Sequence, residues 1–271
     1  MNAPIDIAVC LKWAARPGVV DADERFAGVS AADQAALETA LVLAERSRGS
    51  VTAVTAGPVA AELALREALA CGAHRAVRLD APAALDSVEV ARQLAGVVGD
   101  AAIVVCGDYS LDRGSGSVPA FLAHRLRCAQ ALGLVSVDPT GVVDRMLHAV
   151  RRLDGGRREL LTVPLPCVLS VEGSVARLRR AGLRDALAAR TTTITVRPAA
   201  PFVQHAATAV ITPYRPRARI IASPLDPDPL QRLRSLTDAG GSSGRGETVT
   251  LEPGEAAERI LRSLRDWGYL Q

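Results

Sequence analysis

Short apolar runs alternate with amphipathic segments along the first half of this chain, and this alternation limits the fold more than any other feature. The runs "IDIAVC", "SVTAVTAG", "RAVRLD" and "AAIVVC" have the apolar character of buried strands. Between them, apolar residues recur at helical spacing, and Ser30, Pro58 and Gly72 stand where helices begin or end. Apolar strands joined by helices predict an α/β fold, with a parallel sheet that helices cover on both faces.

The expected strands are residues 5–13, 50–57, 75–80 and 101–107, and the expected helices are residues 30–49, 58–73, 86–99 and 115–127. After residue 137 the pattern changes. Residues 142–173 consist of two strand-like runs around an Asp-Gly-Gly turn, which predicts a β-hairpin. A short helix or helical loop over residues 177–190 and a strand over residues 191–196 are expected next.

These patterns divide the chain into three regions. Residues 1–196 form the predicted α/β domain, which includes the hairpin. Residues 197–252 are rich in Pro and Gly and form a predicted linker arm. Residues 253–271 contain one C-terminal helix, which we expect to pack on the domain or on a partner because an isolated helix has nothing else to bury its apolar face.

The composition argues against several classes of protein. Aromatic residues are only 3% of the chain, too few for a nucleic-acid stacking surface, and the net charge is +3. No apolar stretch approaches the roughly 20 residues that cross a bilayer, and residues 1–18 lack the basic start of a signal peptide. The five cysteines and four histidines are scattered without metal-site spacing. We therefore expect a cytoplasmic protein without membrane insertion, nucleic-acid binding or a metal.

One stretch has the composition of a phosphate-binding loop. Residues 106–118, "CGDYSLDRGSGSV", follow an apolar strand and lead into a predicted helix. Ligands of parallel sheets bind beyond the carboxyl ends of the strands. Small residues and hydroxyls at a helix N-terminus offer donors to an anion. The sequence therefore predicts a Rossmann-like, adenine-nucleotide-binding crevice at this loop.

The predicted hairpin carries the most specific motif of the chain. Its residues with specified character are Ala149, Arg151, Asp154, Gly155, Gly156, Glu159, Leu161, Pro166, Val168, Leu169 and Ser170. This pattern resembles the signature of the electron transfer flavoprotein β-subunit. The opening "VCLKW" and the run "AGPVAAELALREALACGAHRAV" resemble the same family. The chain is thus identified as a divergent member of that family.

The resemblance implies an electron carrier subunit and not an enzyme, so no catalytic residue is expected. Family members form a heterodimer with an α-subunit, which holds most of an FAD. Electrons pass from a flavin-dependent dehydrogenase to that FAD, and then to a membrane quinone reductase or another acceptor. The β-subunit usually holds AMP in its own crevice, and in the electron-bifurcating branch it holds a second FAD. For this chain AMP is expected, with a second FAD or an empty crevice as alternatives.

The resemblance also assigns site residues. The family's nucleotide positions fall at strand ends, at a helix entry and in the loop, on Cys10, Ser30, Ala31, Ala32, Asp33, Ala56, Gly107, Asp108, Tyr109, Ser110, Leu111, Asp112, Arg113, Gly114, Ser115, Gly116, Ser117 and Val118. The acidic run usual in the family's loop is reduced to Asp112, which Arg113 follows as a possible phosphate partner. An aromatic that packs near the shared FAD is replaced by Pro17.

A docking site for the dehydrogenase is implied by the same comparison. The family's leucine anchor falls on Leu183, and the arginines Arg179, Arg180 and Arg184 surround it. An apolar centre with a charged rim is typical of a transient, electrostatically steered interface.

Other adenine-nucleotide-binding modules are the alternative. An ATP-cleaving α/β enzyme would need a SGGxDS-like loop after the first strand, and "CLKWAARPG" lacks one. A universal-stress-type module would need a glycine spacing that Gly107, Gly114 and Gly116 do not have. Neither class explains the hairpin motif.

Overall fold

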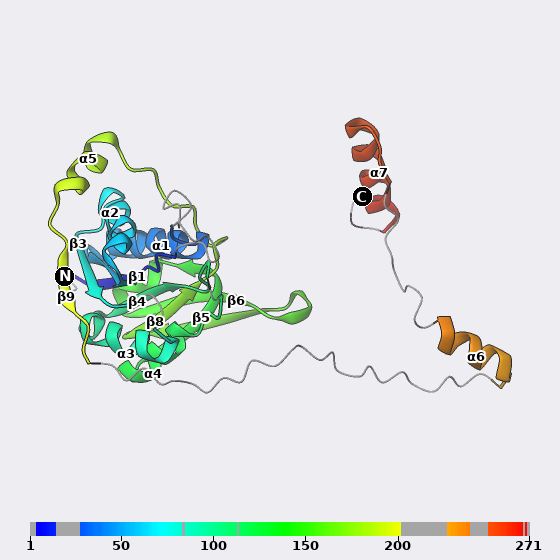
Figure 1. Ribbon diagram of the computed structural model, residues 1–271, viewed down its shortest axis with the longest axis horizontal. Helices are drawn as coiled ribbons and strands as arrows, with labels where there is room; N and C mark the ends of the chain where they lie inside the picture. The colour runs from blue at the N-terminus through cyan, green and yellow to red at the C-terminus, as the bar shows by residue number, and fades with distance from the viewer. Residues whose placement is uncertain are drawn as a thin grey trace. The chain divides into compact units, whose positions relative to one another are not determined.

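The computed structural model describes residues 4–14, 28–82, 85–112, 114–201, 227–238, 249–267 and 269. The chain divides into two compact units, Met1–Ala206 and Ala207–Gln271. We call the first unit the body and the second the C-terminal unit. Figure 1 shows the elements of each.

The described part of the body contains one nine-stranded sheet in the order β7-β6-β5-β8-β4-β1-β2-β3-β9. The strands are β1 (Asp6–Cys10), β2 (Ser50–Gly57), β3 (Arg75–Asp80), β4 (Ile103–Gly107), β5 (Ala129–Asp138), β6 (Met146–Arg152), β7 (Arg158–Pro164), β8 (Cys167–Val171) and β9 (Thr195–Pro198). All pairs from β5–β8 through to β3–β9 are parallel, whereas β5, β6 and β7 pair antiparallel. The predicted α/β fold is confirmed.

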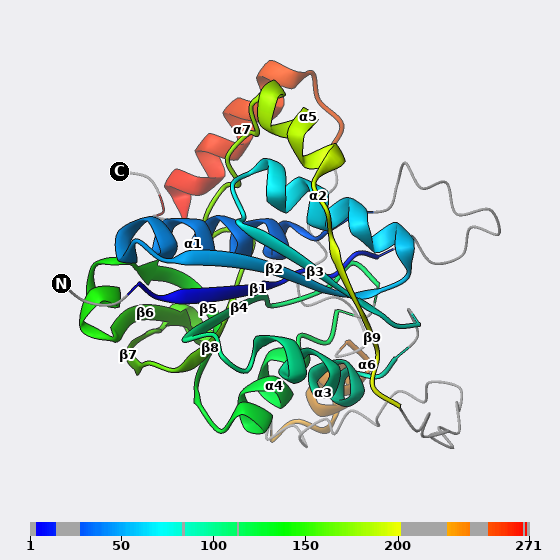
Figure 2. The same ribbon diagram turned by 90° about the vertical axis from the view of Figure 1, so that its left-hand side faces the viewer.

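The helices of the body form two layers on the sheet (Figure 2). One face carries α1 (Ala31–Ser47) and α2 (Glu62–Ala70), and the other carries α3 (Ser87–Val98) and α4 (Val118–Leu126). Side chains alternate along each strand, so Ile7 and Val9 enter the core under α1 and α2. Ala8 and Cys10 enter the core under α3 and α4. Both faces of the sheet are therefore buried, as its continuous apolar strands require.

The predicted hairpin is formed by β6 and β7, joined by the 3₁₀ turn η4 (Asp154–Gly156). It continues the sheet at one edge and projects from the body in Figure 1. Two further 3₁₀ turns are η2 (Val59–Ala61) and η3 (Thr140–Asp144). Strand β5 was not among the predicted elements, although β6 needs it as its neighbour in the sheet.

The segment after β8 leads to α5 (Leu183–Thr191) and then to β9 at the opposite edge of the sheet. The helix predicted over residues 177–190 is thus confirmed in its second half. In the C-terminal unit, the described residues form α6 (Pro229–Asp238) and α7 (Pro253–Asp266). Helix α7 matches the predicted C-terminal helix, whereas α6 lies within the residues expected to be a linker arm.

Candidate functional site

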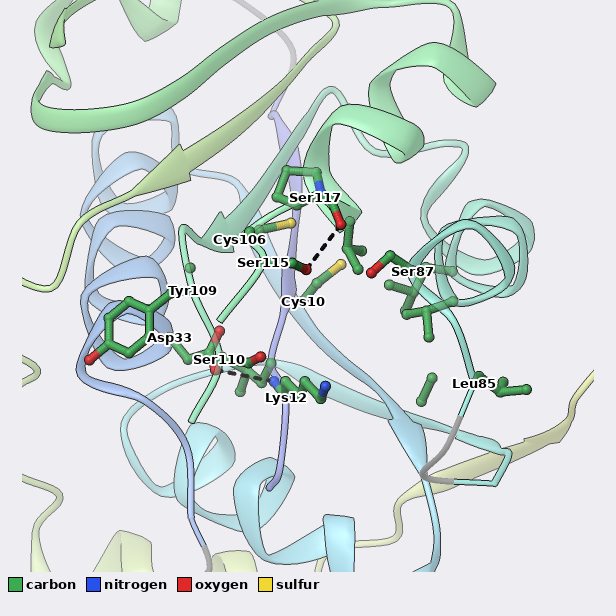
Figure 3. A pocket seen from close by; sticks show the side chains of 18 of the residues that line it. Cys10, Lys12, Asp33, Leu85, Ser87, Cys106, Tyr109, Ser110, Ser115 and Ser117 are labelled. Carbon is green, nitrogen blue, oxygen red and sulfur yellow. Dashed lines mark hydrogen bonds between the residues drawn. The ribbon is translucent and has the colours of Figure 1, made fainter. Parts of the chain in front are cut away.

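A cavity opens at the carboxyl end of the parallel strands, where it is bounded by the sheet, α3 and the first turn of α4 (Figure 3). It encloses about 810 Å³, including its opening to solvent. Its lining comes from β1, β2, β4, the residues that follow β1, β3 and β4, the first turn of α1, and helices α3 and α4. The lining residues are Cys10, Leu11, Lys12, Asp33, Ala56, Pro82, Leu85, Ser87, Val90, Leu94, Cys106, Gly107, Tyr109, Ser110, Ser115, Gly116, Ser117, Val118 and Pro119.

Small side chains form the floor of the cavity. Cys10 and Cys106 are paired neighbours on β1 and β4, and both face the α3–α4 side of the sheet. Ala56 on β2 packs against the same cluster. Hydrogen bonding with Cys10, together with burial, raises the pKa of the Cys106 thiol well above its usual value. The floor is therefore uncharged and apolar enough to lie against a flat aromatic ring.

The loop after β4 is held against the body by backbone contacts. The Asp108 N–H donates to the Val171 carbonyl at 3.1 Å, and the Ser30 hydroxyl donates to the Tyr109 carbonyl at 3.1 Å. Gly116 has a φ of +59°, and a Cβ there would collide with the Asp108 carbonyl. Glycine is thus needed at position 116 both for its conformation and for the close approach of two parts of the loop.

The N-terminus of α4 opens into the cavity with hydroxyl groups around it. Ser117 precedes the helix and makes no side-chain capping bond, whereas Ser30 caps α1 and Asp86 caps α3. The hydroxyls of Ser115 and Ser117 lie 3.1 Å apart at this end (Figure 3). The backbone N–H groups of the first turn therefore have no capping side chain. Such free donors at a helix N-terminus favour the binding of an anion.

Charged groups stand at the mouth of the cavity. The Lys12 Nζ lies 2.7 Å from Asp112 Oδ2, which joins the end of β1 to the loop after β4. The Lys12 backbone N–H points to Asp33 Oδ2 at 3.4 Å. The sequence analysis did not select Lys12, although a lysine directly after a buried strand at the carboxyl edge is a usable signal.

The side wall of the cavity was also missed by the sequence analysis. Leu85, Ser87, Val90 and Leu94 come from α3 and the residues just before it. The apolar side chains of Leu85, Val90 and Leu94 could cover one side of a ring that lies on the thiol floor. These residues reach the crevice only because α3 packs beside α4, and no local sequence motif predicts that packing.

The structure brings most of the predicted nucleotide residues together. Those that line the cavity are Cys10, Asp33, Ala56, Gly107, Tyr109, Ser110, Ser115, Gly116, Ser117 and Val118. Those that do not line it are Ser30, Ala31, Ala32, Asp108, Leu111, Asp112 and Gly114, although Ser30 and Asp112 contact residues that do. Arg113 and Pro17 lie outside the described residues. Their predicted roles stay predictions.

The predicted docking residues lie at the start of α5. Leu183 is 78% exposed, and Arg180 and Arg184 are exposed beside it. Arg179 is tied to the body, since its guanidinium lies 2.8 Å from Glu38 and also pairs with Glu45. It fixes the segment in place and is less available to a partner than the other two arginines.

The family comparison matches this chain to the electron transfer flavoprotein domain over residues 18–202. That range contains most of the crevice, the hairpin and α5. The chain belongs to the electron transfer flavoprotein family. The predicted membership is therefore confirmed, and an electron transfer family agrees with the prediction of a carrier subunit and not an enzyme.

Individual relatives agree with this family. The chain is 36% identical over 169 residues to Protein FixA of Rhizobium meliloti, covering 59% of this chain and 58% of that protein. It is 34% identical over 166 residues to Protein FixA of Bradyrhizobium diazoefficiens, covering 58% and 57%. It is 32% identical over 174 residues to the electron transfer flavoprotein subunit beta of Mycobacterium leprae, covering 60% and 64%. The chain thus spans less than two thirds of the length of these relatives.

Two further observations concern the described part of the chain alone. None of its helices has the length and apolar composition that crossing a membrane requires. Within the same residues, no three His, Cys, Asp or Glu side chains gather as a metal site would need.

Proposed function

We propose that this chain is the β-subunit of a heterodimeric electron transfer flavoprotein. In this role it relays electrons from a flavin-dependent dehydrogenase, through an FAD held mainly by an α-subunit, to a quinone reductase or another acceptor. The observation that carries the proposal is the family match over residues 18–202, which includes both the crevice and α5. Membership of this family argues against the universal-stress-type and ATP-cleaving alternatives.

We further propose that the crevice holds AMP. The residues present fit this group. The thiol floor and the α3 wall offer two apolar surfaces to an adenine ring. Ser115, Ser117 and the backbone N–H groups at the start of α4 would bind the phosphate, and the Lys12–Asp112 ion pair stands at the mouth. A second FAD and an empty crevice are the alternatives.

The chain's own contribution to electron transfer would be to position groups. A flavin would supply the redox chemistry when it is bound. The crevice would hold the AMP as a fixed part of the body, and α5 would present Leu183 to the dehydrogenase. Rigid presentation matters because only a correctly oriented encounter brings two redox groups close together.

The test is co-expression of the full chain with its cognate α-subunit. We expect a stable heterodimer whose visible spectrum has flavin absorbance, and this absorbance should bleach when the dehydrogenase and its substrate are added. Acid extraction of the same complex should release AMP in addition to FAD. The chain expressed alone is the control and should carry no flavin.

Two outcomes would contradict these proposals separately. A stable heterodimer that has no flavin absorbance and that no flavin-dependent dehydrogenase can reduce rules out the electron-carrier role. A reducible heterodimer from which extraction yields two FAD, or no second nucleotide, leaves that role intact and overturns AMP as the ligand of the crevice.

A further inference from the structure

A carboxyl group lies inside the crevice that we propose for an anionic ligand. Asp33, in the first turn of α1, lines the cavity and is only 4% exposed. Its backbone N–H donates to the Ser30 hydroxyl at 3.0 Å, which fixes the residue at the helix start. The carboxyl also lies against Gly107, where a Cβ would come within 2.7 Å of Asp33 Oδ1. Asp33 is therefore locked in place, and its charge belongs to the crevice.

An ionised Asp33 would oppose an anion in this cavity. The cation at the mouth, Lys12, is already paired with Asp112 at 2.7 Å, so that pair adds little net charge. A second ionised carboxylate would leave the described residues of the crevice with an excess of negative charge, in the same cavity as the donors at the start of α4. In a buried site such a charge is poorly screened, and it would weaken binding of a phosphate group.

The surroundings of Asp33 favour its protonated form. Burial raises the pKa of its carboxyl to about 7, although hydrogen bonds from Lys12, Ser30 and Gly107 act in the opposite direction. The titratable groups on the elements packed against this turn are Cys10 and Lys12 at the end of β1, Cys106 on β4, Asp108, Tyr109 and Asp112 in the loop after β4, and Glu172 after β8. Among the described residues in this set only Lys12 is a cation, and its ammonium group is paired with Asp112.

We propose that Asp33 sets the charge of the ligand that the crevice accepts, because an anionic ligand binds with Asp33 protonated and its binding takes up a proton there. The inference rests on the proposed nucleotide crevice and deepens it. It assigns the crevice to phosphate-bearing ligands whose affinity depends on pH. It also gives Asp33 a role as a specificity-determining residue, in addition to its role at the start of α1.

The direction of the pH dependence follows from linkage. An anion close to Asp33 raises its pKa further, so the complex holds more protons than the free crevice. Affinity is therefore highest below the pKa of the free crevice, about 7, and falls as the pH rises through the interval between the two pKa values. If binding raises this pKa by about one unit, affinity falls roughly sixfold between pH 6.5 and pH 8.5, and binding near pH 7.5 takes up about half a proton.

The experiment is calorimetric titration of AMP into the nucleotide-free heterodimer, in two buffers with different ionisation enthalpies, from pH 6.5 to pH 8.5. The difference in heat between the buffers gives the number of protons taken up. Asp33→Asn is the matched variant, since it keeps the shape of the side chain without the charge. AMP itself titrates near pH 6, and it does so equally in both proteins.

We expect the wild type to take up about half a proton near pH 7.5 and to lose about sixfold in affinity across the range. Asp33→Asn should show neither effect and should bind AMP more tightly than the wild type at pH 8.5. A residue that only contacted AMP would give the opposite change, because its replacement would weaken binding.

The wild type alone can overturn the inference, even if Asp33→Asn fails to fold. AMP binding without proton uptake at pH 7.5 refutes it while the nucleotide crevice stands. Equal pH profiles in the wild type and in Asp33→Asn refute it in the same way. No AMP binding at any pH overturns both the inference and the proposed crevice.

Discussion

Gly116 is the residue on which the shape of the crevice loop depends most directly. Its backbone lies in the left-handed region, and its Cα faces the Asp108 carbonyl so closely that no Cβ fits. The contact brings the start of the loop, just after β4, against its end, just before α4. Ser115 and Ser117, on either side of Gly116, owe their position at the helix start to this closure.

Gly116→Ala should therefore reopen the loop. We expect the variant heterodimer to retain its flavin, which the α-subunit mainly holds, and to lose most of the AMP recovered by acid extraction. The strain of an Ala in the left-handed region costs roughly 1–2 kcal/mol, and the collision with the Asp108 carbonyl adds to this cost.

Gly114→Ala is the matched control. Gly114 also has a left-handed conformation, with a φ of +62°, but a Cβ there would lie 3.8 Å from the Ser110 carbonyl, an ordinary contact. The backbone strain is thus similar and the collision is absent. If Gly114→Ala lost as much AMP as Gly116→Ala, strain alone would explain the effect and the close approach would not matter.

At the residue scale, the sequence could predict the site residues that directly follow a strand. It could not predict the residues that reach the cavity only because two helices pack side by side. The loop glycines and serines could be predicted because they come directly after an apolar run. Lys12 has the same position relative to β1, directly after a buried strand. Leu85 and Val90 could not be found this way, because they reach the cavity only when α3 packs beside α4.

Arginine hydrogen bonds fix helix α5 to α1 and α2 near both of its ends. Before its start, the Arg179 backbone N–H and guanidinium bind Glu38 on α1. At its end, Arg66 on α2 donates to the carbonyls of Ala189 and Arg190 at 2.8 and 2.9 Å. These bonds fix the orientation of a helix that buries little of its own surface. Leu183 is thereby presented on a rigid support.

Leu183→Ala should slow reduction of the heterodimer by its dehydrogenase without changing flavin content. We expect the second-order rate constant to fall about tenfold, which corresponds to a loss of roughly 1.4 kcal/mol of binding free energy for one apolar anchor. Stopped-flow absorbance at limiting dehydrogenase concentration measures this rate.

Leu160→Ala is the control for this prediction. Leu160 on β7 is 82% exposed, like Leu183, but it lies on the hairpin and not on α5. It should leave the rate unchanged. Equal rates for the wild type and both variants would remove Leu183 from the docking surface.

At the element scale, strand β5 shows why a regular pattern can be missed. Its register with β8 shifts between Ala131 and Leu134, and its register with β6 shifts between Leu134 and Ser136. Gly133, with a φ of +66°, lies within the first irregularity. A strand with such bulges does not alternate apolar and polar residues cleanly, so periodicity gives no signal for it.

The body and the C-terminal unit differ in what stabilises them. Every residue of the two apolar clusters belongs to the body. In the C-terminal unit, none of the described residues of α7 is buried, and its apolar residues Ile260 and Leu261 are exposed. An isolated amphipathic helix gains most of its stability from the surface that its apolar face packs on.

A chain that ends at Pro201 should therefore fold but bind the α-subunit more weakly. We expect its thermal midpoint to lie within a few degrees of that of the full chain, because the core is complete. Its association with the α-subunit should weaken at least tenfold in a pull-down or sedimentation titration. The full chain is the reference. A truncated chain that unfolds, or that binds the α-subunit as the full chain does, would contradict this division of roles.

At the scale of the molecule, the order of elements could be predicted but the order of strands in the sheet could not. The alternation of apolar runs and helices is local and fixes the class of fold. Which strand lies beside which depends on contacts between distant residues, such as the pairing of Val77 with Thr195. Helix α6 could likewise not be predicted, because it lies between segments rich in Pro and Gly that favour a linker.

The position of β8 also matters while the chain is being made. Strand β8 lies between β4 and β5 in the sheet, so β5 and the hairpin cannot join the parallel strands before β8 has been synthesised. A chain that leaves the ribosome N-terminus first exposes the edge of β4 until then. Every residue that lines the crevice lies at or before Pro119, yet the loop after β4 gains its bond to Val171 only with β8. A nascent chain should thus acquire its ligand site late, long after the last lining residue has emerged.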